Sequence, residues 1–272
     1  MDSVWSAQIG DLFDQLPAAS ERVLLLDYDG TLAPFRPERD QAFPYPGVRK
    51  ILADIVASDH TRLIIVSGRA IADLLPLLDL DPCPEIWGNH GWEQRDPDGT
   101  YRMLPIEPSD AALMQEAEDS VAFLRASMGD AEERFERKPA SVAVHWRGLP
   151  DGAAEALCGA VEQSWAVLAS QGNLELHQFD GGLELRLLGR DKGVVIQEIT
   201  AKLGEESVVA YLGDDRTDED AFRALKGKGL GILVRSEWRE TEAEAHLVPP
   251  DQLLAFLRQW QRAGSGHEHG GR

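Results

Sequence analysis

Short, unbroken hydrophobic runs alternate along this chain with stretches in which apolar residues recur at helical spacing. One run, residues 23–26, leads directly into Asp27 and Asp29, and a run that is apolar on both faces is typical of a buried central strand. The other predicted strands are residues 62–66, 85–87, 207–212 and 229–234, and the predicted helices are residues 3–16 (ended by Pro17), 48–58, 70–78, 191–203, 221–225 (capped by Thr217) and 253–260. This alternation predicts parallel βαβ units and therefore an α/β fold.

The middle of the chain has a different pattern. Residues 141–147 alternate cleanly, with hydrophobic side chains on one face and Ser141, His145 and Arg147 on the other. The predicted elements here are a hairpin of residues 92–95 and 101–104 around a turn at 96–99, helices at 109–128 and 151–171, and strands at 174–179 and 183–187. They predict a small α+β unit, residues 104–187, with an antiparallel sheet whose polar face is exposed. Residues 1–103 and 188–272 form the predicted core.

Composition and charge exclude several classes of partner and location for this protein. A net charge of −20 over 272 residues argues against partners such as nucleic acid or an anionic membrane surface. Cys83 and Cys158 are far apart and form no metal-ligand spacing. The start of the chain lacks the pattern of a signal peptide, and no stretch approaches the roughly 20 apolar residues of a membrane span. We therefore expect a cytoplasmic protein, with a disordered tail over residues 264–272.

Four predicted parallel strands end in polar signatures. These are Asp27 and Asp29; Ser67 and Arg69; Asn89, His90 and Gly91; and Asp214 and Asp215. Each has a simpler interpretation: Ser67 could cap the helix that follows, His90 could be a turn residue, and helix capping explains the acids after Asp215. In a parallel sheet, however, all four strand ends lie on one edge, where α/β folds bind ligands. This convergence favours a functional site.

The acids at this edge predict a divalent cation. Asp27 and Asp214, with the backbone carbonyl of Asp29, are suited to one Mg²⁺ ion that also meets a phosphate group. A calcium loop is a weaker interpretation: Asp27, Asp29 and Glu38 have the spacing of three of its ligands, but Leu32 stands where such a loop needs glycine.

The same edge predicts phosphoryl transfer. An aspartate such as Asp27 can attack phosphorus and form an aspartyl-phosphate. Lys192 can act as a point charge on the phosphate, and Ser67 can donate a hydrogen bond to it. Asp29 can protonate the leaving alcohol and then deprotonate the water that hydrolyses the intermediate.

The motifs that carry this chemistry resemble known families. Residues 27–32, 67–69, 192–193 and 213–215 resemble the four ordered motifs of the haloacid dehalogenase superfamily. A finer resemblance, to trehalose-6-phosphate phosphatases, rests on residues 26–34, 88–91, 141–147, 184–186 and 213–222. The motifs cover residues 22–234 in the family's order. The resemblance implies Mg²⁺-dependent hydrolysis of trehalose 6-phosphate, a small-molecule sugar phosphate, to trehalose and phosphate through an aspartyl-phosphate.

The resemblance also implies an architecture and residue roles. It implies a Rossmann-like core with a cap inserted between the second and third motifs, where the α+β unit is predicted. The implied catalytic residues are Asp27, Asp29, Ser67 and Lys192; the metal ligands are Asp27, Asp29 and Asp214, with Asp215 and Asp218 around them; the substrate-binding residues are Arg69, Asn89, His90, Gly91 and, in the cap, Lys138, His145, Arg147 and Glu184. We expect a monomer in functional pairing with a trehalose-phosphate synthase.

One position departs from the family's pattern. Leu187 stands where the family usually has proline after its Glu-x-Arg motif. This difference keeps open a looser cap hinge or a related substrate, such as another disaccharide or glycosyl-glycerol phosphate, and leaves the phosphatase chemistry untouched. Two further alternatives are a sugar phosphomutase and a catalytically silent sugar-phosphate-binding regulator. Silent relatives typically lose the nucleophile or a metal-binding acid, whereas Asp27 and Asp214 are both present.

Overall fold

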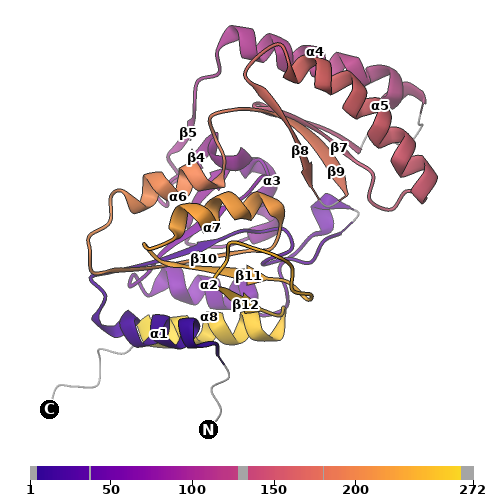
Figure 1. Cartoon of the computed structure of the whole chain (residues 1–272). Coiled ribbons are helices and arrows are strands. Elements are labelled where there is room, and N and C mark those ends of the chain that lie inside the picture. The colour runs from indigo at the N-terminus through magenta and orange to yellow at the C-terminus, as the bar shows by residue number, and fades with distance from the viewer. Residues whose placement is uncertain (1–4, 37, 128–133, 180, 265–272) are drawn as a thin grey trace, which may run out of the picture. The chain divides into compact units, whose positions relative to one another are not determined.

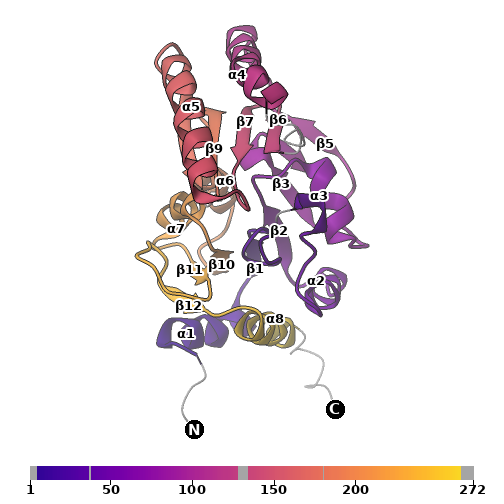
Figure 2. The ribbon, with the colours of Figure 1, turned by 90° about the vertical axis from the view of Figure 1, so that its right-hand side faces the viewer.

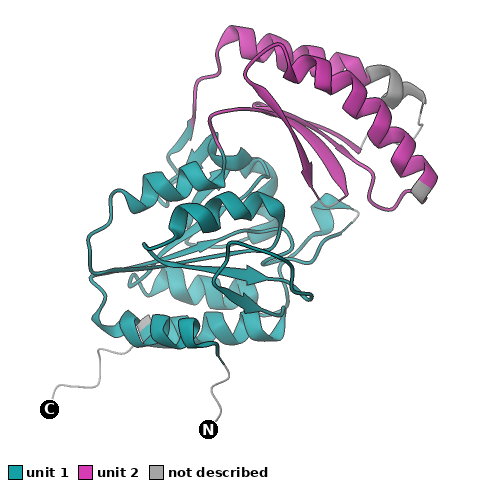
Figure 3. Cartoon of the chain, in the orientation of Figure 1, with its two compact units in different colours: residues 1–102, 191–272 teal, residues 103–190 magenta. Residues whose placement is uncertain are grey.

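The computed structural model describes residues 5–36, 38–127, 134–179 and 181–264. The chain divides into two compact units (Figure 3): unit 1 is Met1–Arg102 with Asp191–Arg272, and unit 2 is Met103–Arg190. The two boundaries between the units follow residues 102 and 190, and the α+β unit expected from the sequence spans residues 104–187. Among the described residues, no helix has both the length and the apolar character needed to cross a membrane.

A mixed sheet, drawn in Figure 1, forms the centre of the core. Its strands are β1 (Glu21–Leu26), β2 (Arg62–Val66), β3 (Glu85–Gly88), β4 (Glu93–Arg95), β5 (Tyr101–Met103), β10 (Ser207–Gly213), β11 (Leu230–Val234) and β12 (Ala245–Leu247). In the described part of the chain their order is β12-β11-β10-β1-β2-β3-β4-β5. Pairs from β12 to β3 are parallel, and β4 runs antiparallel to β3. The predicted α/β fold is confirmed.

Strand β1 is hydrophobic on both faces because its alternate side chains are buried in two different hydrophobic clusters. Leu24 and Leu26 are buried with helices α1 (Ala7–Gln15), α2 (Val48–Ala57), α3 (Ile71–Leu78) and α8 (Asp251–Gly264). Val23 and Leu25 are buried on the other face, with α6 (Lys192–Thr200) and α7 (Glu219–Leu225). Figures 1 and 2 show these two helix layers on opposite faces of the sheet. Helices on both faces leave the ends of the central strands for polar residues.

Parallel pairing places the polar residues that follow four strands at the same, carboxyl-terminal end of the sheet. Asp27 follows the last residue of β1, Ser67 follows β2, Asn89 follows β3, and Asp214 follows β10. The register matches Leu26 on β1 with Leu212 on β10 and with Ile65 on β2. The strands therefore end almost level with one another.

Several element boundaries in unit 1 differ from the predictions, and helix capping explains most of them. Helix α1 begins only after Ser6, whose hydroxyl accepts a hydrogen bond from the amide of Ile9 (3.4 Å); predicted positions 3 and 4 lie outside the described residues. The prediction that Thr217 is a cap was wrong. Asp215 and Asp218 instead cap a 3-10 turn, Arg216–Asp218, reciprocally, and α7 begins at Glu219. Strand β12 was not predicted, because only three residues pair there.

The C-terminal helix also differs from the sequence prediction. Helix α8 starts at Asp251 and runs to Gly264, longer than the hydrophobic residues alone indicated. Most of the predicted disordered tail, residues 265–272, lies outside the described residues.

Unit 2 is an antiparallel sheet with two helices. Its elements are α4 (Pro108–Ser127), β6 (Phe135–Lys138), β7 (Ser141–His145), α5 (Asp151–Ala169), β8 (Leu174–Phe179) and β9 (Gly182–Leu187), with strand order β6-β7-β9-β8. Hydrophobic residues of β7 and β9, such as Val144 and Leu185, are fully buried, as is Trp165 of α5. Met128, the predicted end of α4, lies outside the described residues.

Two features of unit 2 correct the sequence analysis. Strand β6 was missed, because its polar sequence carries no alternation. The polar face of the sheet was expected to be exposed, but Ser141, Glu184 and Arg186 are buried. They are buried because their polar groups pair within the unit: Glu184 accepts from Ser141, and Arg186 donates to Glu175.

The two-sided burial of β1 predicts a large cost for shortening a side chain there. Leu25→Ala is expected to destabilise the protein by about 2–5 kcal/mol, because a cavity is left in a core with no exposed side to collapse onto. The midpoint of urea unfolding, followed by circular dichroism, measures this. Val248→Ala, at an exposed position, is the control and should change stability by less than about 1 kcal/mol. Equal midpoints for the two variants would contradict the assignment of β1 to the core.

Candidate active site

Asp27 is fixed at the end of β1 by both its backbone and its side chain. Its amide donates to the carbonyl of Leu212 on β10 (2.9 Å), which extends the sheet pairing by one residue. Its carboxylate accepts from the ammonium of Lys192 (2.6 Å) and from the hydroxyl of Thr31 (3.2 Å). The residue is 4% exposed. A buried carboxylate with a lysine at hydrogen-bond distance is strongly oriented.

Asp214 and Asp218 join Asp27 in one cluster of acids. Each offers a carboxylate oxygen, and these three oxygens lie within 4.8 Å of one another. Asp214 follows β10 directly, and the 3-10 turn after it returns Asp218 to the same place. All three residues are buried. Lys192 is the first residue of α6, where Asp191 caps the helix, and its ammonium bridges Asp27 and Asp218.

Asp218 holds the loop around it through a saturated carboxylate. One of its oxygens accepts from the amides of Asp214 and Asp215 (2.9 Å each). The other accepts from Lys192 (2.7 Å) and from the hydroxyl of Tyr211. A carboxylate offers about four acceptor positions. Asp218 therefore acts as a structural anchor for residues 214–215.

The carboxylate of Asp214, unlike that of Asp218, is not fully hydrogen-bonded. The residue is 2% exposed, and its Oδ1 has no hydrogen-bond partner among the described residues. An unpartnered carboxylate oxygen in a buried site is costly unless a cation or water meets it. This orphaned oxygen, in a cluster of acids, has the donor chemistry that a hard divalent cation prefers.

Burial also controls the protonation of the cluster. Burial raises the pKa of Asp27 to about 7, against the opposing effect of Lys192. Burial, followed by the charges of Asp27 and Asp218, raises the pKa of Asp214 well above its ordinary value. Burial alone would lower the pKa of Lys192, but the carboxylates of Asp218 and Asp27 outweigh it and hold the pKa above its ordinary value. Burial therefore disfavours the charged form of Asp27 and Asp214, and a cation beside them would favour it.

Asp29 lies outside this cluster. Its carboxylate forms a two-point ion pair with the guanidinium of Arg69, with both contacts at 2.6 Å. Arg69 also donates to the carbonyl of Arg39 (2.8 Å). The side chain of Asp29 is 30% exposed, so it is less enclosed than Asp27. The predicted contact of Asp29 with a metal through its backbone carbonyl stays a prediction.

The loops after β2 and β3 are tied to each other. The amide of Asn89 donates to the carbonyl of Arg69 (2.8 Å), and the amide of His90 donates to the carbonyl of Ser67 (3.0 Å). Asn89, His90 and Gly91 all have left-handed backbone angles. Asn89 is 2% exposed, and neither polar atom of its side chain has a protein partner in the part of the chain described. This buried amide is therefore a candidate for contact with a polar ligand.

Unit 2 has a buried polar cluster of its own. The carboxylate of Glu184 accepts from Lys138 (3.2 Å) and from Ser141 (2.6 Å). The ring of His145 is 3.3 Å from Glu136. Arg147 follows β7 and lies so close to Gly181 that a Cβ there would be 3.0 Å from its side chain. Hydrogen-bond donors and acceptors on the same sheet suit a ligand that is rich in hydroxyl groups.

The chain matches a family whose defining region includes both units. The family model described as trehalose-phosphatase matches residues 25–249. The chain belongs to the trehalose-phosphatase family. Trehalose-phosphate phosphatase B of Arabidopsis thaliana is 31% identical over 281 residues, which cover 95% of this chain and 72% of that protein. Probable trehalose-phosphate phosphatase 3 of Oryza sativa subsp. japonica is 32% identical over 270 residues, with 90% and 72% covered.

A solved structure supports the fold of this family member. The C-terminal domain of the C. albicans trehalose-6-phosphate phosphatase superposes with a TM-score of 0.82 at 20% sequence identity, covering 96% of this chain and 99% of that chain. Similarity at that identity shows the fold. With the family established, the prediction of a phosphoric monoester hydrolase is confirmed at the level of the family.

Sequence reasoning missed several residues of the site in this trehalose-phosphatase family member. Thr31 and Tyr211 hold Asp27 and Asp218, and Glu136 and Ser141 belong to the polar cluster of unit 2. Tyr211 lies inside a hydrophobic strand, where a tyrosine is ordinarily core, so no signal distinguished it. Ser141 had a signal, because its place in the alternation puts it on the same face as Arg147.

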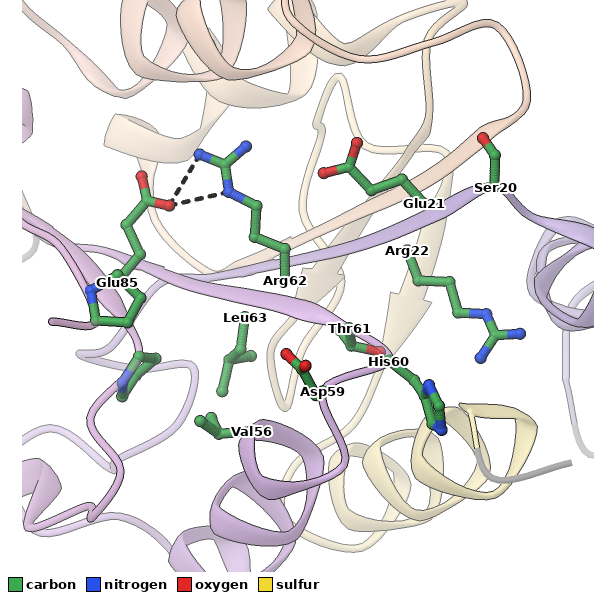
Figure 4. Close-up of a pocket in the computed structure, with 12 residues that line it drawn as sticks. Ser20, Glu21, Arg22, Val56, Asp59, His60, Thr61, Arg62, Leu63 and Glu85 are labelled. Carbon is green, nitrogen blue, oxygen red and sulfur yellow. Dashed lines mark hydrogen bonds and ion pairs between the residues drawn. The ribbon is translucent and has the colours of Figure 1, made fainter. Parts of the chain in front are cut away.

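A cavity of about 390 Å³ lies at the amino-terminal ends of the parallel strands, opposite to the ends that carry the acid cluster (Figure 4). It is lined by residues before or at the starts of β1, β2 and β3, among them Arg22, His60 and Glu85. Arg62 and Glu85 face each other there, with nitrogen–oxygen distances of 3.0 and 2.8 Å. The acid cluster follows the carboxyl ends of β1 and β10, so the two features are separate.

Gly30 tests how tightly the acid cluster is built. Its φ is +82°, and a Cβ there would lie 2.0 Å from a carboxylate oxygen of Asp214. Gly30→Ala is therefore expected to displace Asp214 and to lower phosphatase activity at least about tenfold, with both strain and a clash as causes. Gly10→Ala, where a Cβ meets nothing within 4 Å, is the matched control and should keep normal activity. Normal activity in Gly30→Ala would contradict this geometry.

Proposed function

We propose that this chain hydrolyses trehalose 6-phosphate to trehalose and inorganic phosphate, with Asp27 as the nucleophile. The observation that carries the proposal is the buried contact of Asp27 with Lys192 beside Asp214, whose carboxylate has an unpartnered oxygen. Membership of the trehalose-phosphatase family supplies the reaction class. A nucleophilic acid needs a phosphate brought close to it, and Lys192 together with a bound cation would make that possible.

We propose Mg²⁺ as the cation of the acid cluster. Asp27, Asp214 and the backbone carbonyl of Asp29 would hold it, with Asp215 and Asp218 around them. The saturated carboxylate of Asp218 supports this division, because it has no acceptor position left for a metal. When bound, Mg²⁺ would offset the repulsion between the phosphate and the acids.

Two covalent steps follow on this chain's own residues. A carboxylate oxygen of Asp27 bonds to phosphorus while the bond from phosphorus to the sugar oxygen breaks, and the sugar oxygen takes a proton from Asp29. Asp29 then takes a proton from water, whose oxygen attacks the aspartyl-phosphate and releases phosphate. Lys192 and the hydroxyl of Ser67 stabilise the phosphoryl oxygens throughout. Asp27 is regenerated as a carboxylate.

Asp29 must leave Arg69 and take up a proton from the solvent before it can act as an acid. In the ion pair, both of its oxygens accept hydrogen bonds from the guanidinium. We propose that the substrate phosphate competes for Arg69, because guanidinium binds phosphate in the same two-point geometry. Substrate binding would then free Asp29 only when there is an ester to cleave. Asn89, His90 and Gly91, on the loop tied to that of Arg69, would contact the same substrate.

We propose unit 2 as the cap that recognises the sugar. Lys138, His145, Arg147 and Glu184 would bind its hydroxyls, and the buried polar cluster around Glu184 supports this. Leu187 at the end of β9 keeps another disaccharide or glycosyl-glycerol phosphate open as the substrate. A phosphomutase or a silent regulator is less well supported, since Asp27 and Asp214 are both in place. We propose that the protein is a monomer. We also propose that it works in functional pairing with a trehalose-phosphate synthase, the class of enzyme that would supply its substrate.

Replacing the nucleophile tests the reaction. Asp27→Asn is expected to lower kcat by roughly 10³-fold or more, because an amide cannot form the acyl phosphate, while binding of the sugar phosphate survives. Phosphate release with Mg²⁺ from a panel of sugar phosphates, trehalose 6-phosphate included, measures activity, and calorimetry measures binding. A strong chelator should abolish turnover by the wild type. Normal rates in Asp27→Asn would exclude this mechanism, and release from another sugar phosphate alone would redirect the substrate assignment.

Substitutions in unit 2 test sugar recognition. His145→Ala and Glu184→Gln are expected to lower kcat/KM for trehalose 6-phosphate by about 10–100-fold, which corresponds to the loss of hydrogen bonds to charged groups. Hydrolysis of para-nitrophenyl phosphate, which has no sugar, should change by less than about threefold. Glu162→Gln on the exposed side of α5 is the matched control for Glu184→Gln. Equal losses on both substrates would argue against a cap that reads the sugar.

A further inference from the structure

Arg239 lies on the segment between β11 and β12 and contacts the loop that carries Asp214. Its guanidinium donates to the backbone carbonyl of Asp215 (2.8 Å) and, through two nitrogens, to the carbonyl of Asp214 (3.4 and 3.3 Å). It also donates to the carbonyl of Glu240 (2.9 Å). The side chain is 22% exposed, so it is largely enclosed by these partners. None of the motifs noted in the sequence includes Arg239.

The peptide unit between Asp214 and Asp215 is consequently held at both ends. Arg239 binds its carbonyl oxygen, and the carboxylate of Asp218 accepts from its amide (2.9 Å). The preceding peptide is held as well, because the amide of Asp214 donates to the same carboxylate (2.9 Å). With both flanking peptides fixed, the direction of the Asp214 side chain is set by its backbone.

Backbone control matters here because the side chain of Asp214 has little else to orient it. Its Oδ1 has no hydrogen-bond partner in the described structure. The carboxylate of Asp27, by contrast, is held directly by Lys192 and Thr31. An acid that must present an unpartnered oxygen to a cation depends on the groups that position its backbone.

Glu219 anchors Arg239 in turn. Its carboxylate pairs with the guanidinium and also accepts from the hydroxyl of Thr241 (2.9 Å) and the amide of Glu242 (2.7 Å). Glu219 is the first residue of α7, where a carboxylate is favoured by the helix dipole. The segment that carries Arg239 is thus clamped to the helix that begins beside the acid cluster.

We propose that Arg239 is a positioning residue for Asp214, and that the Glu219–Arg239 pair sets the affinity of the acid cluster for its divalent cation. The pair acts through the two carbonyls of the 214–215 loop, to which Arg239 donates. This inference rests on the proposed function, because it assumes that Asp214 binds a cation.

Titration with Mg²⁺ alone tests the proposal without relying on activity. The melting temperature of the full-length chain is followed as Mg²⁺ is added, since an ion that binds the folded state raises it. Arg239→Ala is expected to raise the concentration of Mg²⁺ that gives half of the shift by roughly 10–100-fold, the usual cost of losing a partner that orients a metal ligand. The Mg²⁺ concentration for half-maximal activity should rise in parallel, whereas KM for the sugar phosphate at saturating Mg²⁺ should stay within about threefold of the wild type.

Further variants separate positioning from general structure. Arg239→Lys should restore part of the response, because an ammonium can reach a carbonyl but cannot span Glu219 and both carbonyls as a planar fork does. Glu219→Gln should shift the response in the same direction, and the fold-changes of Glu219→Gln and Arg239→Ala should not multiply in the double variant. Arg223→Ala removes an arginine that pairs with Asp220 on the exposed side of α7, and it should match the wild type within about twofold.

The outcomes distinguish this inference from the function on which it rests. A wild-type chain that shows no Mg²⁺ response contradicts the proposed cation site itself. A wild-type response that is unchanged in Arg239→Ala overturns the positioning role alone. If Arg239→Ala does not fold, the lysine and Glu219→Gln variants decide, and normal Mg²⁺ responses in both overturn the proposal.

Discussion

The contact between Lys192 and two buried carboxylates is the interaction on which the rest of the core site depends. Asp27 and Asp218 are both buried, and burying either without a counter-charge would be strongly unfavourable. Lys192, itself 3% exposed, meets both at 2.6 and 2.7 Å. Asp27 and Lys192 are 165 positions apart along the chain, so their ion pair also joins the two sequence halves of the core.

One ammonium does not balance the acids that gather around it. Asp214 adds a third carboxylate within 4.8 Å of the other two, so three buried acids share one ammonium, and burial raises the pKa of Asp27 and of Asp214. For a structural ion-pair network this would be a defect. For a site that must hold a cation and accept a phosphate beside it, the deficit supplies the driving force for cation binding.

The sequence indicated which residues lie together at the strand ends, for a reason that is specific to parallel sheets. Asp27, Ser67, Asn89 and Asp214 each follow a hydrophobic run, so the strand ends could be read directly and topology placed them on one edge. The partners of these residues could not be read in the same way. The pairing of Asp29 with Arg69 depends on side-chain conformations, and Arg239 reaches the Asp214 loop from a segment with no pattern of its own.

The errors in secondary structure have the same origin. Strand β6 is polar because its side chains pair with other polar groups across the sheet, as Lys138 does with Glu184. A period of two then marks no hydrophobic face, and the strand cannot be recognised alone. Thr217 looked like a helix cap because threonine commonly is one, but it lies inside the 3-10 turn that Asp215 and Asp218 cap reciprocally. In both cases, contacts that form only in the folded chain outweigh the local secondary-structure preference of the sequence.

The different roles of Asp214 and Asp218 follow from backbone geometry and not from residue type. The two residues are four positions apart, equally buried and chemically identical. The tight turn between them directs the amides of Asp214 and Asp215 at Asp218, and with Lys192 and Tyr211 these fill its acceptor positions. Asp214 cannot use its own amide in this way and keeps an oxygen without a protein donor. The carboxylate that the fold leaves unsatisfied keeps an oxygen free to accept from a ligand, and the carboxylate that it saturates binds the backbone amides that flank the first.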